Sequence, residues 1–239
     1  MKERLDKVMA QQGLAATRSE AESWIRLGRV RVDGKVVQKA GTFVATTAAV
    51  ILDAPERYVS RAGLKLASVA AALGVEFAGK VVLDVGSSTG GFTDYALQHG
   101  AAKVIAVDVG TEQLHPSLRG NKRVELHEKT DIRGFMPSET PQIVVIDVSF
   151  ISLREILPHI ARISGPATQV IAMVKPQFEA TKKQLGSTGV IKNDTVRRAI
   201  LKDFEQWAKL RFMVQNKADS TIAGAHGNHE RFYLLRTGA

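Results

Sequence analysis

Residues 81–94 read Val81-Val82-Leu83-Asp84-Val85-Gly86-Ser87-Ser88-Thr89-Gly90-Gly91-Phe92-Thr93-Asp94, an apolar run that leads through a glycine-rich turn into the start of a helix. The β-branched run that closes on Asp84 is typical of a buried parallel strand. The glycines allow a tight turn and a close approach of the backbone to a ligand. The stretch therefore predicts a ligand site at the end of a strand in an α/β domain.

A second predicted strand, residues 103–108, narrows the choice of ligand because it also ends in an acid, Asp108. An acid roughly 20 residues past the glycine turn binds the ribose hydroxyls of a nucleoside in doubly wound sheets. The turn lacks the G-x-G-x-x-G spacing that cradles a pyrophosphate, so we expect a nucleoside without phosphates. S-adenosylmethionine is such a ligand, and the acid before the glycines, Asp84, suits its cationic end.

The same turn also fits a different class of enzyme. Gly86-Ser87-Ser88-Thr89-Gly90 matches G-x-S-x-G, the nucleophile elbow of serine hydrolases, and it lies between a predicted strand and a predicted helix. A hydrolase would also need an acid and a histidine later in the chain, and it would leave Asp84 and Asp108 without a role. We therefore favour the nucleoside pocket and keep the hydrolase as an alternative.

Composition places the chain among globular, basic proteins. Its 239 residues are 44% hydrophobic, and 33 lysines and arginines against 24 acids give a net charge of +9, which favours a polyanionic partner such as nucleic acid. The absence of cysteine excludes disulfides and thiolate metal sites, and no metal site is expected. The N-terminus lacks the apolar core of a signal peptide, and no stretch approaches the roughly 18 apolar residues of a membrane span. We expect a cytoplasmic protein that does not bind membranes.

The first fifth of the chain reads as a small α+β unit. Two short helices are expected, over residues 4–12 and from Thr17 or Ser19 to Gly28, followed by a hairpin around Asp33-Gly34 and a strand over 50–52. The pattern Arg4-Leu5-Asp6, Gly13, Arg18-Ser19-Glu20-Ala21, Ile25, Gly28, Val30, Val32-Asp33-Gly34 and Val37 resembles the S4 RNA-binding domain. That resemblance implies binding of structured RNA through its phosphates and shape. The candidate contacts are Arg4, Arg18, Arg26, Arg29, Arg31 and Lys35, with Lys39 in the same cluster.

The rest of the chain alternates between strands and helices, after a linker over residues 53–60. Strands are expected over 81–84, 103–108, 124–127, 142–147, 167–174, 212–218 and 232–235, and helices from 58 to about 73 and over 92–99, 153–163 and 194–210. This alternation predicts a doubly wound, mostly parallel sheet with helices on both faces and an antiparallel final strand. Asp84, Asp108, Asp147 and Lys175 each end a strand, so they should converge on one crevice at the carboxyl ends of the strands.

Several motifs from residue 58 onward resemble the FtsJ-type ribose 2′-O-methyltransferases. They are Ser60-Arg61-Ala62-Gly63-Leu64-Lys65-Leu66, residues 84–92, Asp147-Val148-Ser149-Phe150, Val174-Lys175-Pro176-Gln177-Phe178-Glu179 and Glu230-Arg231-Phe232. Together with the S4-like head, nearly the full length is similar to the haemolysin A (TlyA) family of ribosomal RNA 2′-O-methyltransferases. The resemblance implies a Rossmann-like methyltransferase domain over 61–239 behind an S4-like domain over 1–52.

The resemblance also implies a catalytic tetrad of Lys65, Asp147, Lys175 and Glu230. A ribose hydroxyl is a poor nucleophile, so its attack on a sulfonium methyl group benefits from removal of its proton. Lys175 is the candidate base, because burial and a neighbouring cation would both help it to be neutral part of the time. Asp147 would then orient Lys175, while Lys65 and Glu230 position the ribose.

For the cofactor, the resemblance implies S-adenosyl-L-methionine, with its contacts spread along four strand ends. The residues expected to bind it are Asp84, Gly86, Ser88, Gly90, Phe92, Asp108, Asp131, Ile132 and Asp147. Arg61, Arg119 and Arg133 are expected to extend the basic surface toward ribosomal RNA, on a subunit or free, with cytidine as the target nucleotide. Two non-catalytic alternatives stay open: an RNA-binding protein with an inactive crevice, and a pore-forming haemolysin, which the short alternating segments disfavour.

Overall fold

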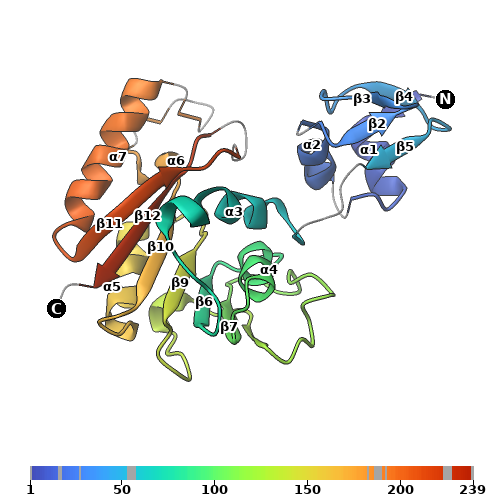
Figure 1. The fold of residues 1–239 in the computed structure, drawn as a ribbon. Coiled ribbons are helices and arrows are strands. Elements are labelled where there is room, and N and C mark those ends of the chain that lie inside the picture. Colours follow the sequence, from blue (N-terminus) through green and yellow to red (C-terminus); the bar gives the residue numbers. More distant parts are fainter. Residues whose placement is uncertain are drawn as a thin grey trace. The chain divides into compact units, whose positions relative to one another are not determined.

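The protein is described here by a computed structural model, which covers residues 2–15, 18–26, 28–52, 58–181, 183–185, 190–191, 193–222 and 228–237. The chain divides into two compact units, Met1–Arg57 and Tyr58–Ala239 (Figure 1). Most of the predicted linker, residues 53–57, and the predicted helix cap Thr17 lie outside the described residues.

The first unit is the small α+β fold that the alternating pattern predicts. Its elements are β1 (Lys2–Arg4), α1 (Leu5–Gln11), α2 (Arg18–Arg26), β2 (Val30–Val32), β3 (Lys35–Val36), β4 (Phe43–Ala45) and β5 (Val50–Leu52). Asp33 and Gly34 both have positive φ, 49° and 79°, as a two-residue hairpin turn between β2 and β3 requires. Leu5, Met9 and Ile25 are fully buried, so the two helices share one core.

The second unit is built on a seven-stranded sheet with the order β11-β12-β10-β9-β6-β7-β8. The first five strands along the chain are parallel, and β12 is antiparallel to both of its neighbours. The strands are β6 (Val81–Val85), β7 (Lys103–Val107), β8 (Val124–His127), β9 (Ile143–Ile146), β10 (Gln169–Val174), β11 (Phe212–Asp219) and β12 (Arg231–Thr237). This is the doubly wound, mostly parallel sheet expected from the sequence.

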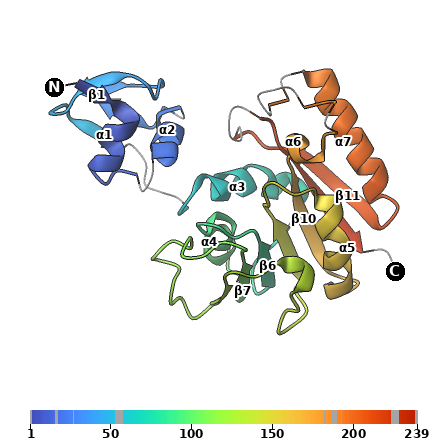
Figure 2. The same ribbon diagram turned by 180° about the vertical axis from the view of Figure 1, so that it is seen from behind.

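Helices cover both faces of this sheet (Figures 1 and 2). Alternate strand residues pack with α3 (Arg61–Leu73) and α4 (Gly91–Gln98) on one face, and with α5 (Leu153–Ile163) and α7 (Asp194–Ala208) on the other. The remaining helical elements are η1 (Ile132–Gly134) and α6 (Pro176–Glu179). Because both faces are buried, the central parallel strands are mostly apolar, which is why they stand out in the sequence.

The structure corrects some of the predicted details. β6 runs one residue further than predicted, so Asp84 lies within the strand and Val85 ends it. Two short strands, β1 and β4, were not predicted, and they form a separate antiparallel pair in the first unit. They are three residues each, too short to show an alternating pattern. Among the residues that the structure describes, no helix combines the length and apolar character needed to cross a membrane.

Candidate active site

A small cavity of about 150 Å³ lies at the carboxyl ends of the parallel strands. Asp84 lies next to the last residue of β6, Asp147 directly follows β9, and Lys175 directly follows β10. Parallel neighbours end at the same edge of a sheet, which brings these three residues together. The lining residues are Ala62, Asp84, Gly86, Ser87, Ser88, Thr89, Phe92, Asp147, Ser149 and Lys175.

The glycine turn after β6 forms one wall of the cavity in a conformation that a side chain could not adopt. Gly86 has a φ of +78°, and a Cβ placed on it would run into the backbone carbonyl of Asp147. The amide groups of Gly86 and Ser87 both donate to the carbonyl of Val107, which fixes the turn against β7. The turn therefore leaves an open cradle of backbone between two strand ends.

Asp84 is a buried acid with an unused acceptor. Its side chain is 1% exposed, Oδ2 accepts a 2.6 Å hydrogen bond from the Thr93 hydroxyl, and Oδ1 has no hydrogen-bond partner among the described residues. Burial raises the pKa of Asp84 to about 7, and the nearby carboxylates of Asp147 and Asp108 contribute in the same direction. A buried acceptor of this kind is costly alone and suits a cationic or N–H donor inside the cavity.

Lys175 and Asp147 form an ion pair on the wall of the same cavity. Lys175 Nζ lies 2.6 Å from Asp147 Oδ1 and donates a 2.8 Å hydrogen bond to Ser149 Oγ. The Lys175 and Asp147 side chains are only 11% and 17% exposed. Lys175 Nζ also lies 5.9 Å from the centre of the Phe178 ring. The ammonium group is thus held at a defined place beside the cradle.

Lys65 and Glu230 form a second ion pair, with Lys65 Nζ 2.6 Å from Glu230 Oε2. Lys65 comes from α3, and Glu230 directly precedes β12. The two residues do not line the cavity, but both are almost completely buried, with side chains 10% and 3% exposed. The structure thus brings the four tetrad candidates together as two lysine–carboxylate pairs.

The position of Lys65 depends on a close approach of α3 to α4. A Cβ on Gly63 would lie 2.9 Å from the carbonyl oxygen of Gly91, and a Cβ on Gly91 would lie 2.8 Å from the amide nitrogen of Gly63. A side chain at either glycine would push the two helices apart. The mutual contact therefore sets how deeply α3 inserts beside the final strand.

Not every predicted cofactor residue lines the cavity. Asp108 packs against the glycine turn, where its carboxylate accepts hydrogen bonds from the amides of Ser88 at 2.8 Å and Gly110 at 2.6 Å. Gly90 faces Leu114 and Leu118 instead of the cavity. Asp108 and Gly90 therefore contribute to the conformation of the glycine turn.

Asp131 and Ile132 also lie outside the lining. Asp131 caps η1 by accepting from the amide of Arg133 and forms an ion pair with the Arg133 guanidinium at 2.6 Å, which lowers the pKa of the carboxyl group. Ile132 is buried in the core between the sheet and α5. The strongest contacts of both residues are thus structural.

Four lining residues were not among the sequence predictions: Ala62, Ser87, Thr89 and Ser149. Ser87 has a buried hydroxyl without a hydrogen-bond partner among the described residues, and it lines the cavity together with Asp84. Ser87 and Thr89 alternate with predicted residues of the glycine turn, and Ser149 lies in the Asp147-Val148-Ser149-Phe150 motif. Position within those motifs is the signal that could have identified them.

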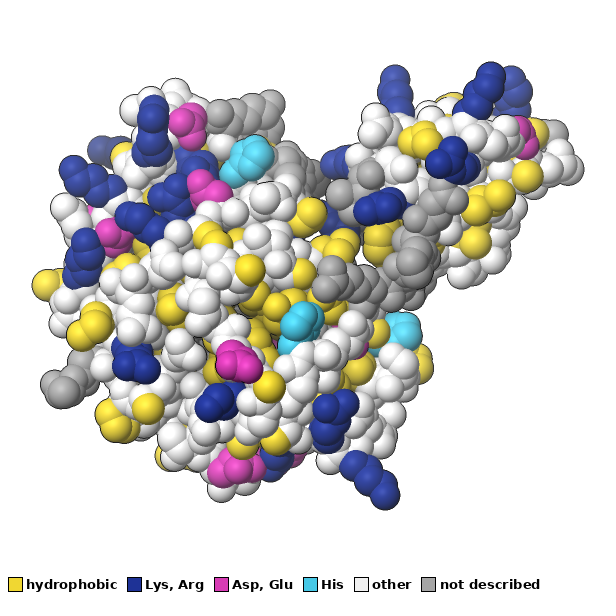
Figure 3. Space-filling model, in the orientation of Figure 1, with side chains coloured by type: hydrophobic (Ala, Val, Ile, Leu, Met, Phe, Trp, Pro, Cys, Tyr) yellow, Lys and Arg dark blue, Asp and Glu magenta, His cyan; other side chains and the backbone are white. Residues whose placement is uncertain are grey.

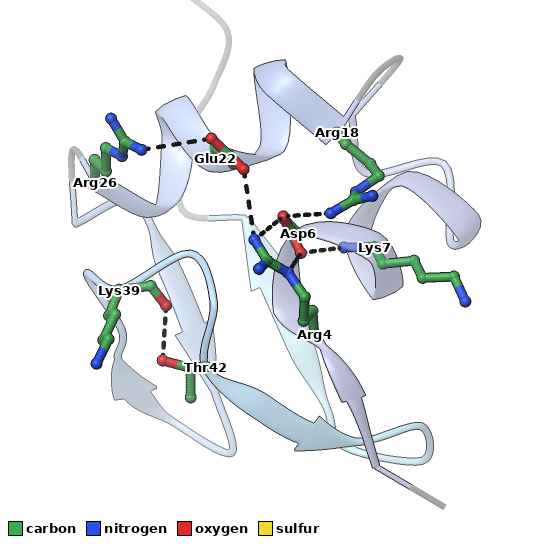
Figure 4. A network of polar contacts seen from close by, with 8 residues as sticks. All are labelled: Arg4, Asp6, Lys7, Arg18, Glu22, Arg26, Lys39 and Thr42. Carbon is green, nitrogen blue, oxygen red and sulfur yellow. Dashed lines mark hydrogen bonds and ion pairs between the residues drawn. The ribbon is translucent and has the colours of Figure 1, made fainter. Parts of the chain in front are cut away.

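The predicted RNA-binding arginines of the first unit divide into two groups. Arg4 and Arg18 both pair with the fully buried Asp6, at 2.7 and 3.2 Å, and the hydrogen bond from Arg4 holds the pKa of that carboxyl far below its ordinary value (Figure 4). Glu22 pairs with Arg4 at 3.6 Å and with Arg26 at 3.5 Å, extending the network. Arg4 and Arg18 thus link α1 to α2, whereas the Arg26–Glu22 pair lies within α2.

The second group follows α2 and lies on or beside the hairpin. Arg29, Arg31 and Lys35 are exposed, and the Arg31 guanidinium donates to the carbonyl of Gly34. All three are therefore accessible to a polyanionic partner, as is the exposed Lys39.

The basic candidates of the second unit are partly engaged within the chain. Arg119 donates to the carbonyl of Leu114 and pairs with Glu128, and Arg133 pairs with Asp131 and Glu155. Arg61 is the first residue of α3 and is half-buried. An ordinary role in surface ion pairs therefore accounts for Arg119 and Arg133.

Ser88 lacks the surroundings of a hydrolase nucleophile. Its hydroxyl donates to Gln113 Oε1 at 3.0 Å, and no contact with a histidine is present among the described residues. A nucleophilic serine needs a base within hydrogen-bond reach. The geometry thus gives no support to the G-x-S-x-G alternative.

Comparison with known proteins agrees with this geometry. A family model for the FtsJ-like methyltransferases matches residues 58–237, and one for the S4 domain matches residues 3–50. The 16S/23S rRNA (cytidine-2′-O)-methyltransferase TlyA of Mycobacterium tuberculosis is 38% identical over 240 residues, 98% of this chain and 90% of that protein. The 23S rRNA (cytidine-2′-O)-methyltransferase TlyA of Campylobacter jejuni is 45% identical over 183 residues, 74% of this chain and 70% of that protein.

A solved structure described as a hemolysin from Streptococcus thermophilus superposes on nearly the whole chain. It covers 99% of this chain and 88% of that protein, with a TM-score of 0.78 and 38% sequence identity. The two-unit organisation is thus common to both chains.

Proposed function

The chain belongs to the FtsJ-like methyltransferases that carry an S4 domain, the TlyA and haemolysin A family, and from this premise we propose that it methylates the ribose 2′-hydroxyl of ribosomal RNA with S-adenosylmethionine as donor. The relatives from Mycobacterium tuberculosis and Campylobacter jejuni are named for cytidine 2′-O-methylation, which favours cytidine as the target nucleotide. The observation that carries the proposal is the placement of the Lys175–Asp147 pair on the wall of the cavity that also contains the unpartnered oxygen of Asp84.

The residues of the cavity fit the proposed cofactor. Asp84 offers a buried acceptor for its cationic amino group, and Ser87 offers a second unpartnered polar atom. The open backbone at Gly86 leaves room that a side chain would fill. Asp108, which accepts a hydrogen bond from the Ser88 amide, would bind the ribose hydroxyls. When bound, the cofactor would supply an electrophilic methyl group on a sulfonium.

Lys175 is the group best placed to take the hydroxyl proton. Its Nζ lies in the cavity wall and is held by the ion pair with Asp147 and by its hydrogen bond to Ser149 Oγ. In its neutral form Nζ would accept the proton of the ribose hydroxyl, and Asp147 would stabilise the resulting ammonium. A positioned base of this kind accounts for a rate factor of about 10² to 10⁴.

Lys65 and Glu230 would serve the reaction by alignment. The ion pair holds both side chains in place in a buried environment. Substrate binding therefore does not have to fix their conformations. Because they lie outside the cofactor cavity, we assign them to the side of the ribose. The exposed Arg29, Arg31 and Lys35 of the S4 domain would hold the surrounding RNA through its phosphates.

The test is transfer of labelled methyl groups from S-adenosylmethionine to purified ribosomal subunits, followed by digestion of the RNA to nucleosides. We expect label on the 2′ oxygen of cytidine, a loss of transfer of at least about 10²-fold in Lys175→Ala, and nearly unchanged cofactor binding in that variant. The matched control is Lys122→Ala, an exposed lysine before β8, which should transfer normally. Label on a base would contradict the role of the tetrad, and cofactor binding without transfer would favour an RNA-binding protein with an inactive crevice.

A further inference from the structure

A second cavity, of about 380 Å³, lies outside the proposed active site, between α7 and the two antiparallel strands at one edge of the sheet. We call it the α7 groove. Its lining is strongly basic and consists of Arg198, Leu201, Lys202, Glu205, Gln206, Lys209, Lys217, Arg231 and Tyr233. Figure 3 shows Lys and Arg side chains gathered over this part of the second unit, with fewer acids among them.

The cations of the groove come from three different elements. Arg198, Lys202 and Lys209 follow one face of α7 and the turn after it, Lys217 lies on β11, and Arg231 begins β12. Leu201 and Tyr233 are almost fully buried below them. The groove thus has an apolar floor and basic walls, and it is not a single charged helix face.

The acids near the groove orient several of these cations without removing the excess of positive charge. Glu205, whose side chain is 17% exposed, pairs with Lys217 at 2.6 Å and Lys209 at 2.9 Å. Asp219 pairs with Arg231. Lys202 is exposed and has no acidic partner among the described residues.

One end of the groove lies at the same edge of the sheet as the proposed active site. Arg231 directly follows Glu230 and lies opposite Val174 in the sheet, and Val174 directly precedes Lys175. The groove continues from there along α7 toward Lys209. A strand that enters the crevice with its ribose therefore has a basic path leading away from the reacting hydroxyl.

From this continuity and charge we infer that the α7 groove binds the phosphate backbone of the RNA substrate next to the modified nucleotide. The inference rests on the proposed function for the identity of the RNA. Phosphate contacts of this kind hold the substrate in register and carry no sequence information. They make binding weaker as salt rises, because each neutralised phosphate releases counterions.

The test compares two double variants of the full-length chain. Lys202→Gln with Lys209→Gln removes two positive charges from the groove. The control, Lys80→Gln with Lys122→Gln, removes two positive charges from the loops that precede β6 and β8. These loops lie at the amino ends of the strands, whereas the proposed active site lies at the carboxyl ends. The probe is a ribosomal RNA fragment, and its dissociation constant is measured by fluorescence anisotropy over a range of salt concentrations.

For the groove variant we expect about tenfold weaker binding at low salt and a log–log salt slope shallower by about 1.5, since each lost phosphate contact contributes roughly 0.7 to 0.9 to the slope. The control variant should keep the slope of the unmodified chain. Equal losses in both variants, or an unchanged slope in the groove variant, would overturn the inference. The inference would also be overturned if the groove variant bound the RNA fragment normally but bound whole ribosomal subunits weakly. That result would indicate that the groove binds an acidic protein surface.

Methyl transfer separates this inference from the proposed function. The groove variant should have a higher KM for RNA than the unmodified chain. Its kcat, measured at saturating RNA, should be unchanged. If the unmodified chain transfers methyl groups and the groove variant keeps its KM, the inference fails while the proposed function stands. If the unmodified chain transfers none and the salt slopes still differ as expected, the proposed function fails while the groove remains an RNA-binding surface.

Discussion

Lys65 Nζ and Glu230 Oε2 lie 2.6 Å apart in a place where the side chains are only 10% and 3% exposed. One residue comes from α3 and the other from the segment before β12, so the pair joins the first helix of the catalytic unit to its last strand. Two charges taken out of water in this way gain little net stability together, but either one alone is costly. This asymmetry makes it possible to separate the structural effect of the pair from its effect on the reaction.

We expect Glu230→Leu to destabilise the protein by about 3 kcal/mol, because it leaves Lys65 as an uncompensated buried cation. Adding Lys65→Met should restore most of that loss, since a buried ion pair can be replaced by apolar groups of similar volume. Methyl transfer should remain lost in the double variant. Urea unfolding and transfer assays on the two variants give the comparison, and recovery of transfer together with stability would reduce the pair to a structural role.

The segment that carries Glu230 is held by Arg197, which the sequence did not single out. Its guanidinium donates to the carbonyl of His229 at 3.0 Å and to Asp219 Oδ1 at 2.6 Å, and its side chain is 10% exposed. We expect Arg197→Gln to lower kcat about tenfold, because a small displacement of a positioned group is costly to the rate. The affinity for S-adenosylmethionine should not change, since Arg197 does not line the cofactor cavity.

Arg198→Gln is the matched control for this prediction. Arg198 is the next residue on α7, but its side chain is 67% exposed and pairs only loosely with Asp194, at 3.4 Å. Removal of its charge should leave kcat at saturating RNA unchanged, although the KM for RNA should rise because Arg198 lines the α7 groove. Equal losses of kcat in both variants would point to a general effect of charge on α7.

The sequence predicted the parts of the site that local patterns determine. Apolar strands ending in Asp147 and Lys175 stand out because both faces of the sheet are buried, and the order of strands and helices places those ends at one edge. Residue types therefore sufficed to find the crevice.

Local patterns could not determine which lysine meets which carboxylate. The Lys65–Glu230 pair depends on how closely α3 approaches α4, and Arg197 reaches His229 from a helix packed on the other face of the sheet. The same limit explains Asp131 and Ile132, which follow β8 as expected but turn toward Arg133 and the core. Long-range packing decides these contacts.

The close approach of α3 to α4 gives a prediction about packing. We expect Gly91→Ala to destabilise the protein by about 2 kcal/mol, because the added methyl group would lie 2.8 Å from Ala62 Cβ and from the amide nitrogen of Gly63. Transfer should fall further than the fraction of folded protein, since α3 carries Lys65. The control is Gly134→Ala, where a Cβ would meet nothing within 4 Å. Thermal unfolding that leaves both variants equal would contradict the packing argument.

Asp84 gives a prediction about pH. Its pKa in the folded protein is about 7, raised from an ordinary value of 3.8 mainly by burial. Between pH 4 and 7, Asp84 therefore keeps its proton in the folded state but has lost it in the unfolded state. The stabilisation from this group is complete below pH 4 and is lost as the pH rises to about 7, by up to about 4 kcal/mol.

S-adenosylmethionine should oppose that loss, because its cationic amino group favours the ionised form of Asp84. We therefore expect its affinity to increase as the pH rises from 6 to 8, and to vary much less in Asp84→Asn. The stability difference between the two proteins, measured by urea unfolding at each pH, cancels the contribution of other carboxylates such as Asp6, whose lowered pKa acts in the opposite direction. A constant difference from pH 4 to 8, together with a flat affinity profile in the unmodified protein, would show that Asp84 stays ionised and that burial alone does not control its charge.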